Sequence, residues 1–375
     1  MKIVSVEIIR DKRKVTLPEE WRAAWREPDG EAIKSWGFSY FKVSTDEGIV
    51  GFGPYTGNPG EHVMSFLKGF DPYRVGEFWD AFMSGKRAGT ANVNASGLEI
   101  ALWDIIGKAS GKPVYKLLGA CRNRIMAYAA TSRLLEIKEH IRQIHELMDM
   151  GFKAVKLRLH RPKPEDDLRM VKEVRDAVGD DLLILVDANQ NNPSRQYNFW
   201  SRRTALKMAR ELDKLDVFFL EEPLPRRDVE GLAEIASSVD MFIAGGEHSR
   251  CIYDFRDHIV KGAYDIVQPD VILGAIGIIG MKKVGVIADY FGRLLIPHVC
   301  GASNLALSLA ATLQAVATIE NCPMVEYPFD PPILTVETQQ PIVKEPILVD
   351  RDGFIEIPDK PGIGIEIKDY DDLKN

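Results

Sequence analysis

Cysteine is scarce in this chain, and long hydrophobic runs are missing. The four cysteines among the 375 residues are widely spaced, with no CxxC pair, which argues against a disulfide framework and against a thiolate zinc site. The longest apolar run, residues 271–281, is shorter than the roughly 20 residues that a membrane helix needs. We therefore expect reduced cysteines, no membrane association and a cytoplasmic protein.

The chain also lacks an excess of positive charge and a nucleotide-binding motif. Lys and Arg number 48 against 55 Asp and Glu, a net charge of −7, and the basic residues are scattered. This distribution argues against nucleic acid as a partner. No GxxxxGK[ST] sequence occurs, and Gly274, Gly277 and Gly280 have the wrong spacing for dinucleotide binding. A small molecule is the partner that we expect.

The composition is that of a folded protein with more than one domain. Hydrophobic residues make up 45% and charged residues 27% of the sequence, which is typical of globular proteins. From residue 126 onward, eight runs typical of strands alternate with helical patterns, and eight is the number of strands in a closed (β/α) barrel. These runs are 126–131, 154–160, 182–189, 217–223, 241–247, 265–270, 294–298 and 324–327.

The first third of the chain has a different pattern. Three strand-like runs, 2–9, 38–44 and 49–53, precede a helical pattern over 94–110. We expect a separate α+β domain over 1–125, a barrel over 126–327, and a C-terminal segment, 328–375, that packs back on the first domain.

Three acidic residues end consecutive predicted barrel strands. Barrel enzymes place their chemistry at the C-terminal ends of the strands, so Asp187, Glu221 and Glu247 should meet at the barrel mouth. Three unpaired carboxylates at close range repel one another, so a divalent cation is expected between them. All-oxygen ligation favours Mg²⁺ or Mn²⁺ over zinc. The alternative is that each acid caps a helix or pairs with a surface lysine.

The next two predicted strands end at Asp270 and His298. A carboxylate beside an imidazole fixes its tautomer and raises its basicity, which makes His298 a candidate general base. The alternative is a buried histidine that hydrogen-bonds to the backbone.

Cationic side chains alternate along the second predicted strand. Lys156, Arg158 and His160 should all face the barrel interior, since alternate residues of a strand share a face. Together they suit the carboxylate of a substrate, or the enediolate formed from it. The alternative is that they neutralise the metal-binding carboxylates.

Taken together, these motifs resemble the enolase superfamily, mandelate racemase subgroup. The resemblance covers nearly the whole chain in the family's order. It is carried by the segments LEIALWDIIGK (98–108), VKLR (155–158), VDANQ (186–190), LEEP (220–223), GE (246–247), QPD (268–270), PH (297–298), VE (325–326) and PGIGIE (361–366).

The resemblance implies an α/β fold, a (β/α)7β barrel closed over by an N-terminal α+β capping domain. It also implies Mg²⁺ held by the three strand-end carboxylates, and an Asp270–His298 dyad that removes the proton α to a substrate carboxylate. The enediolate is then stabilised by the metal, Lys156 and Arg158, while Glu326 donates a hydrogen bond to the substrate carboxylate. Relatives are commonly homo-oligomers, so we expect one here.

One departure from the family pattern bears on the reaction. The family often has a second lysine, used as a base, where this chain has Arg158, and arginine stays protonated near neutral pH. This favours dehydration of an acid sugar, an aldonate or aldarate, to a 2-keto-3-deoxy acid. A racemase or epimerase with Lys156 as the second base is the alternative. Asp270 stands where the lactonising subgroup has a lysine, which disfavours lactonisation.

Substrate specificity in this family is set by loops of the capping domain, here 21–28 and 54–59. We expect Trp21, Arg22, Arg26 and Tyr55 to bind the substrate. His160 and Asn189 at strand ends should join them, and the loop 191–201 adds Arg195, Tyr197 and Trp200. Two further classes compete: a Schiff-base aldolase with Lys156 as nucleophile, and a barrel that binds without catalysis.

Overall fold

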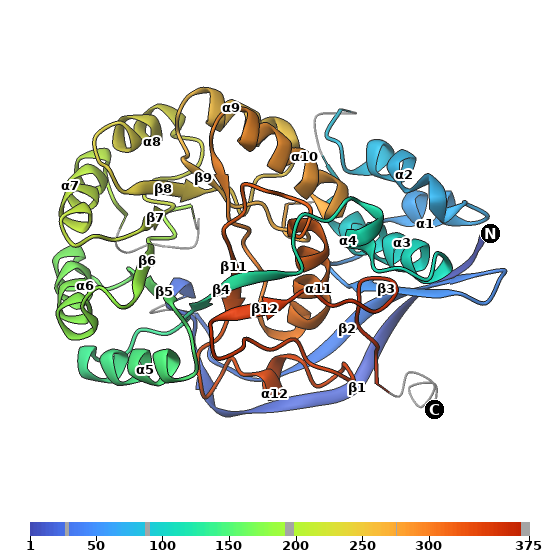
Figure 1. The fold of residues 1–375 in the computed structure, drawn as a ribbon, viewed down its shortest axis with the longest axis horizontal. Coiled ribbons are helices and arrows are strands. Elements are labelled where there is room, and N and C mark those ends of the chain that lie inside the picture. The colour runs from blue at the N-terminus through green and yellow to red at the C-terminus, as the bar shows by residue number, and fades with distance from the viewer. Residues whose placement is uncertain (27–29, 87–90, 192–198, 275, 369–375) are drawn as a thin grey trace.

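The computed structural model describes residues 1–26, 30–86, 91–191, 199–274 and 276–368, arranged as a capping domain beside a barrel of parallel strands (Figure 1). The capping domain contains an antiparallel sheet in the order β1-β2-β3, formed by β1 (Ile3–Trp21), β2 (Ile33–Thr45) and β3 (Val50–Pro54). Its helices are α1 (Glu61–Leu67), α2 (Val75–Phe82), α3 (Ser96–Ala109) and α4 (Val114–Leu117). The structure therefore confirms the helix expected over 94–110.

Helix α3 packs directly on β3 because glycines line the contact. A Cβ atom at Gly53 would overlap the carbonyl of Gly97, and one at Gly97 would overlap the carbonyl of Pro54. The helix covers the sheet with apolar side chains, and Leu98, Leu102 and Ile105 are fully buried in the core of the capping domain. This close contact needs glycine on both sides, since any side chain would push helix and strand apart.

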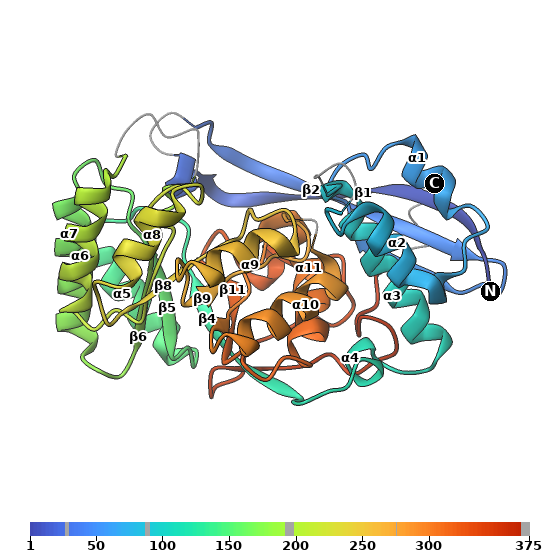
Figure 2. The ribbon, with the colours of Figure 1, turned by 90° about the horizontal axis from the view of Figure 1, so that it is seen from above.

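Strand β1 is much longer than the sequence predicted, so the expectation of a strand that ends near residue 9 is wrong. It pairs with β2 as far as Trp21, opposite Ile33, with irregular register after Arg10 and Thr16. Figure 2 shows this ribbon extending from the capping domain over the barrel. The part of the strand beyond residue 9 was missed because it is exposed and rich in charged residues. The sequence there lacks the alternation of apolar and polar residues that is typical of a half-buried strand.

All eight predicted barrel strands are present and parallel. They are β4 (Arg124–Ala130), β5 (Ala154–Arg158), β6 (Leu183–Asp187), β7 (Phe219–Glu221), β8 (Phe242–Gly245), β9 (Ile266–Val267), β10 (Leu294–Leu295) and β11 (Met324–Pro328). Their order, β10-β9-β8-β7-β6-β5-β4-β11, curls around an apolar interior. In the described part of the chain, β10 and β11 are not joined by a ladder of hydrogen bonds. Instead, Leu295 N of β10 donates to Asn321 O, shortly before β11, at 3.0 Å.

A helix follows each of the first seven barrel strands, as in a (β/α)7β barrel. These helices are α5 (Ile137–Asp149), α6 (Pro164–Val178), α7 (Arg202–Asp213), α8 (Val229–Ala236), α9 (Ile252–Val260), α10 (Gly277–Tyr290) and α11 (Leu305–Val316). Helix α6 shows how the sequence sets these bounds. It starts with Pro164 and three acids in its first turn and ends before Gly179, whose φ of 58° is easily adopted only without a side chain.

The C-terminal segment contacts both parts of the molecule. After α12 (Val336–Gln339), strand β12 (Phe354–Glu356) pairs antiparallel with β4 of the barrel. Trp36 of β2 donates its indole N–H to Thr338 O at 2.9 Å, and Ile363 N donates to Asp104 of α3 at 3.0 Å. Within the described residues, no helix has both the length and the apolar character needed to cross a membrane.

Candidate active site

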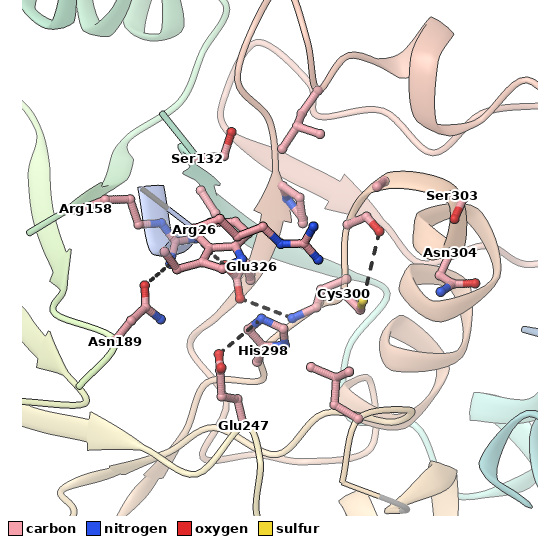
Figure 3. A pocket seen from close by; sticks show the side chains of 18 of the residues that line it. Arg26, Ser132, Arg158, Asn189, Glu247, His298, Cys300, Ser303, Asn304 and Glu326 are labelled. Carbon is pink, nitrogen blue, oxygen red and sulfur yellow. Dashed lines mark hydrogen bonds and ion pairs between the residues drawn. The ribbon is translucent and has the colours of Figure 1, made fainter. Parts of the chain in front are cut away.

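A cavity of about 490 Å³ lies at the C-terminal ends of the barrel strands, beside the far end of β1 (Figure 3). The barrel contributes Arg158, Asn189, Glu247, His298 and Glu326 to its wall, and the capping domain contributes Trp21, Trp25 and Arg26. Charged groups from the barrel therefore face aromatic and cationic groups from the capping domain across one cavity.

Lys156 of β5 is completely buried between two carboxylates beneath this cavity. Its Nζ lies 2.7 Å from Glu221 Oε2 and 2.8 Å from Glu326 Oε1. Burial alone lowers the pKa of Lys156, but Glu221 and Glu326 outweigh it and raise that pKa above its usual range. Lys156 is therefore held as a cation, and its charge is already matched by the chain.

Arg158, two residues farther along β5, is fixed along its edge. Its Nη1 pairs with Asp187, and its Nε donates to Thr131 O at 2.7 Å. Burial lowers the pKa of Arg158, but Asp187 and Glu326 raise it by more, so the guanidinium stays charged. Strand β5 thus presents Lys156 and Arg158, two of the three predicted cationic side chains, to the interior.

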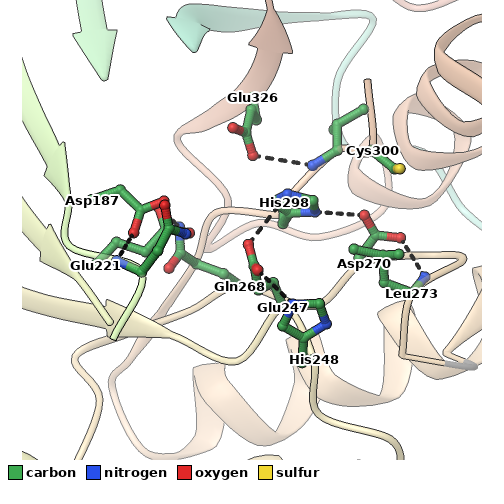
Figure 4. Close-up of polar contacts among 12 residues, drawn as sticks. Asp187, Glu221, Glu247, His248, Gln268, Asp270, Leu273, His298, Cys300 and Glu326 are labelled. Atoms are coloured by element: carbon green, nitrogen blue, oxygen red, sulfur yellow. Dashed lines mark hydrogen bonds and ion pairs between the residues drawn. The ribbon is translucent and has the colours of Figure 1, made fainter. Parts of the chain in front are cut away.

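The three carboxylates predicted as metal ligands come from neighbouring strands (Figure 4). Asp187 and Glu221 are register partners at the ends of β6 and β7, and Glu247 lies two residues after β8. Each is paired with cations of the chain, Asp187 with Arg158, Glu221 with Lys156, and Glu247 with two histidines. In the described ranges, no three His, Cys, Asp or Glu side chains are gathered as a ready metal site.

One oxygen of this acidic group has no partner. Glu221 Oε1 is buried and accepts no hydrogen bond from any residue that the structure describes, although Glu221 Oε2 binds Lys156 and Gln268. Burial raises the pKa of Glu247, but His298 and His248 outweigh it and hold that pKa well below its usual range. A buried carboxylate oxygen without a partner is an environment that attracts a cation.

Asp270 and His298 form the predicted pair. His298 Nδ1 lies 2.7 Å from Asp270 Oδ2, and its Nε2 lies 3.2 Å from Glu247 Oε2. Burial lowers the pKa of His298, but Glu247, Glu326 and Asp270 together raise it to about 10. Asp270 lies beyond the end of β9, where its Oδ1 accepts hydrogen bonds from the backbone N–H groups of Ile272 and Leu273. Strand β9 ends at Val267, earlier than predicted, and these bonds fix the carboxylate that orients the imidazole.

Glu326 lies opposite this pair on β11. It accepts hydrogen bonds from Val299 N at 3.1 Å and from Lys156 Nζ. Burial raises the pKa of Glu326, but Lys156 and His298 outweigh it and lower that pKa. The resemblance implied that Glu326 donates a hydrogen bond to the substrate. In this arrangement it is an ionised acceptor.

The predicted substrate-binding residues are divided. Trp21, Arg26 and Asn189 line the cavity, whereas Arg22 and His160 are not among its lining residues in the described chain. Arg22 is exposed, and its Nε donates to Gly30 O at 2.8 Å. His160 Nε2 lies 2.8 Å from Oδ1 of Asn189, which itself lines the cavity.

Tyr55 and the loop 191–201 also lie apart from the main cavity or outside the described residues. Tyr55 lines a second cavity of about 350 Å³, which shares Cys300 and Asn304 with the first. Trp200 is buried in the barrel core, where its backbone N–H donates to Gln190. Arg195 and Tyr197 lie outside the described residues.

Two residues of the site were not identified from the sequence. Glu222, the second acid of LEEP, lines the cavity with a φ of 45°, and burial together with Glu247 raises its pKa well above the usual range. His248 contacts Glu247 Oε1 through Nε2 at 3.0 Å. Glu222 directly follows Glu221 and His248 directly follows Glu247, so their position next to a predicted metal ligand was the sequence signal that could have identified them.

Comparisons with known proteins agree with this architecture. Residues 31–119 match the mandelate racemase / muconate lactonizing enzyme N-terminal domain, and residues 139–371 match the enolase C-terminal domain-like model. An arabinonate dehydratase of Saccharolobus solfataricus is 32% identical over 88% of this chain and 87% of its own length. A D-galactarolactone cycloisomerase of Agrobacterium fabrum is 29% identical over 87% of this chain and 88% of its own length.

Among solved structures, an L-talarate dehydratase of Polaromonas sp. JS666, complexed with Mg and L-glucarate, has a TM-score of 0.79 and 27% identity over 98% of this chain and 95% of that one. Relatives at this level of identity therefore include both dehydratases and cycloisomerases of acid sugars. The matched domains cover both parts of the molecule in order, and the chain belongs to the mandelate racemase / muconate lactonizing enzyme family of the enolase superfamily.

Proposed function

We propose that this protein is a Mg²⁺-dependent dehydratase of an acid sugar, an aldonate or an aldarate, and that its product is a 2-keto-3-deoxy acid. Among its relatives are an arabinonate dehydratase and an L-talarate/galactarate dehydratase, each at least 30% identical over most of the chain. These names support the substrate class, and the arrangement of bases supports the reaction.

The observation that carries the proposal is that, among the described residues, one side of the site offers a base and the other offers two cations that are already paired. His298 lines the cavity and is oriented by Asp270. On the other side, Lys156 is held between two carboxylates and Arg158 is paired with Asp187. Racemisation by 1,1-proton transfer needs a base on each face of the substrate carbon. Dehydration needs only one group that takes a proton and returns it to a leaving hydroxyl.

The donor set fits Mg²⁺. Asp187, Glu221 and Glu247 offer only oxygen, and Glu221 Oε1 is buried without a hydrogen-bond partner. Hard divalent cations prefer such ligands, and the Polaromonas neighbour is complexed with Mg. We propose these three residues as the ligands. Bound there, Mg²⁺ supplies positive charge that polarises the substrate carboxylate and lowers the energy of the enediolate.

The protein's own residues account for the remaining chemistry. Arg158 faces the cavity and binds the substrate carboxylate, while buried Lys156 pairs with Glu221 and Glu326 and holds both in place. Glu247 contributes most to the raised pKa of His298, so a cation that engages Glu247 would lower this pKa and free Nε2. Neutral His298 then takes the α-proton at Nε2, and the negative charge that develops on the carboxylate oxygens is stabilised by Arg158. His298 then gives a proton to the β-hydroxyl, which leaves as water. The resulting enol rearranges to the 2-keto-3-deoxy acid.

Proton NMR in D₂O with Mg²⁺ and a panel of aldonates and aldarates tests the proposal. We expect a 2-keto-3-deoxy product from the wild type, and a loss of about 10²- to 10⁴-fold in rate for His298→Asn, the contribution typical of a general acid–base. His145→Asn, on the exposed face of α5, is the matched control and should retain the wild-type rate.

Other outcomes identify the competing reactions. Exchange of the α-proton without loss of water would show an epimerase or racemase. Trapping of the substrate on the protein by borohydride would show an aldolase that uses Lys156. A wild type that leaves every acid sugar unchanged would contradict the proposed substrate class.

A further inference from the structure

Trp25 contacts the reactive end of the site from the capping domain. It lies in a short 3-10 helix, Ala24–Arg26, directly after β1, and lines the cavity. The Arg158 guanidinium carbon lies 4.8 Å from the centroid of the Trp25 ring, within the range of a cation–π contact. The two residues are 133 positions apart in the sequence, so this contact joins the capping domain to the barrel.

The contact places the Arg158 guanidinium over the Trp25 ring, while its N–H groups reach the barrel. Nε donates to Thr131 O and Nη1 pairs with Asp187. Nη2 lies 4.0 Å from Glu326 Oε1 and makes no hydrogen bond to any described residue. One terminal nitrogen of Arg158 thus keeps its donors for a ligand in the cavity, which is the direction in which a substrate carboxylate would bind.

Trp25 is itself held firmly by the surrounding structure. Its ring packs edge-on against Trp21 at 6.3 Å, and Trp21 packs in the same manner against Trp36 at 5.8 Å. The Trp21 indole N–H donates to Ser132 Oγ at 3.0 Å, and Ala24 N donates to Ser132 O at 2.7 Å. Ser132 follows β4, the barrel strand beside β5. The segment that carries Trp25 is therefore tied to the barrel one strand away from Arg158.

We propose that Trp25 is a positioning residue that holds the Arg158 guanidinium with Nη2 directed at the substrate carboxylate. The contact between Trp25 and Arg158 is independent of the proposed function, but its effect on catalysis rests on that function. It also accounts for arginine at this position: a planar guanidinium can be covered on its face while its edge donates, whereas a lysine ammonium is a point charge with rotating donors. Correct docking of the capping domain is then required for the cationic end of the site to form.

A double-mutant cycle between Trp25 and Arg158 tests this assignment. The variants are Trp25→Leu, Trp25→Phe, Arg158→Lys and the two double mutants. Urea unfolding without substrate gives the coupling between the two side chains, and kcat and KM are measured for the acid sugar that the wild type converts. Arg158→Lys keeps a cation beside Asp187, so the reference background should still fold.

We expect Trp25→Leu to lower kcat/KM by about 2- to 30-fold, the range of a cation–π contact, and Trp25→Phe to recover much of the loss. In the Arg158→Lys background, Trp25→Leu should have less than a 2-fold effect, because the plane that the indole holds is gone. A merely structural role for Trp25 would give the same loss in both backgrounds.

The two readouts separate this inference from the proposed function. Equal effects of Trp25→Leu in the wild-type and Arg158→Lys backgrounds, in unfolding and in kcat/KM, would overturn the assignment even if the wild type is a dehydratase. If the wild type converts no acid sugar, the proposed function fails, and the unfolding cycle still decides whether Trp25 is coupled to Arg158. Coupling in unfolding without any loss of kcat/KM would also overturn the positioning role.

Discussion

Replacement of Lys156 by methionine should destabilise this protein far more than loss of any exposed lysine. Lys156 is completely buried, and its ammonium lies 2.7 and 2.8 Å from Glu221 and Glu326, which are also buried. Methionine has a similar length and fits the apolar part of the space. It leaves two buried carboxylates without their cation, which typically costs about 3–5 kcal/mol for a broken buried pair.

Urea unfolding at neutral pH in the presence of EDTA measures the effect. Lys344→Met is the matched control, because Lys344 pairs with Glu366 at a similar 2.9 Å but both side chains are about half exposed. An exposed pair of this kind contributes at most about 1 kcal/mol. We expect Lys156→Met/Glu326→Gln to regain part of the loss, since one of the uncompensated charges is then removed.

Equal losses for Lys156→Met and Lys344→Met would refute this reasoning. Such a result would mean that Glu221 and Glu326 take up protons or rearrange at little cost when the lysine is lost. Lys156 would then not be held as a permanently paired cation, and the argument against its use as a second base would no longer stand.

Three further predictions concern the metal, the interface between the domains and the substrate. Mg²⁺ should stabilise the folded protein by about 2.7 kcal/mol at a concentration 100 times its Kd, which raises the midpoint of thermal unfolding. Glu221→Gln should abolish this rise. Glu99 of α3 accepts hydrogen bonds from the backbone N–H groups of Ile278 and Ile279 in α10 of the barrel, and burial raises its pKa from 4.5 to about 7. The folded state therefore binds this proton more tightly than the unfolded one. Stability should be full below pH 4.5 and fall by about 3 kcal/mol as the pH rises to 7, a slope that Glu99→Gln removes in urea unfolding. Arg26→Ala should lower kcat/KM for aldarates by about 10-fold or more relative to aldonates, because Arg26 lines the cavity and a charged hydrogen bond to the distal carboxylate is lost. Arg22→Ala is the control: it removes a side chain that binds Gly30 O and should leave this ratio unchanged.

The barrel and its charged residues were predictable because both follow from local patterns. Polar residues stand at the end of a barrel strand or within a few residues after it, and the geometry of a parallel barrel brings these ends to one mouth. Asp187, Glu221 and His298 could therefore be placed together without knowledge of the loops. The start and end of α6 were likewise given by proline, acids and glycine within the segment itself.

The capping domain was harder to predict because its role depends on contacts across the chain. The charged outer face of β1 hid a strand that continues to Trp21. Whether Arg22, Arg26 or Tyr55 reaches the cavity depends on how that strand crosses the barrel, and only Arg26 lines it. His160 is not among the lining residues in the described chain for a related reason: β5 ends at Arg158, so alternation along the strand no longer sets the direction of its side chain.

The balance of charge at the barrel mouth links metal and substrate. Six carboxylates gather there, all nearly or fully buried: Asp187, Glu221, Glu222, Glu247, Asp270 and Glu326. Lys156 and Arg158 are the permanent cations among them, and His298 and His248 add charge only when protonated. Burial and Glu247 raise the pKa of Glu222, which favours its neutral form and so reduces part of this excess. A substrate carboxylate adds to the remaining negative charge, so its binding should depend on a cation bound beforehand. We therefore expect acid sugars to bind weakly without Mg²⁺, and metal and substrate to strengthen each other's binding.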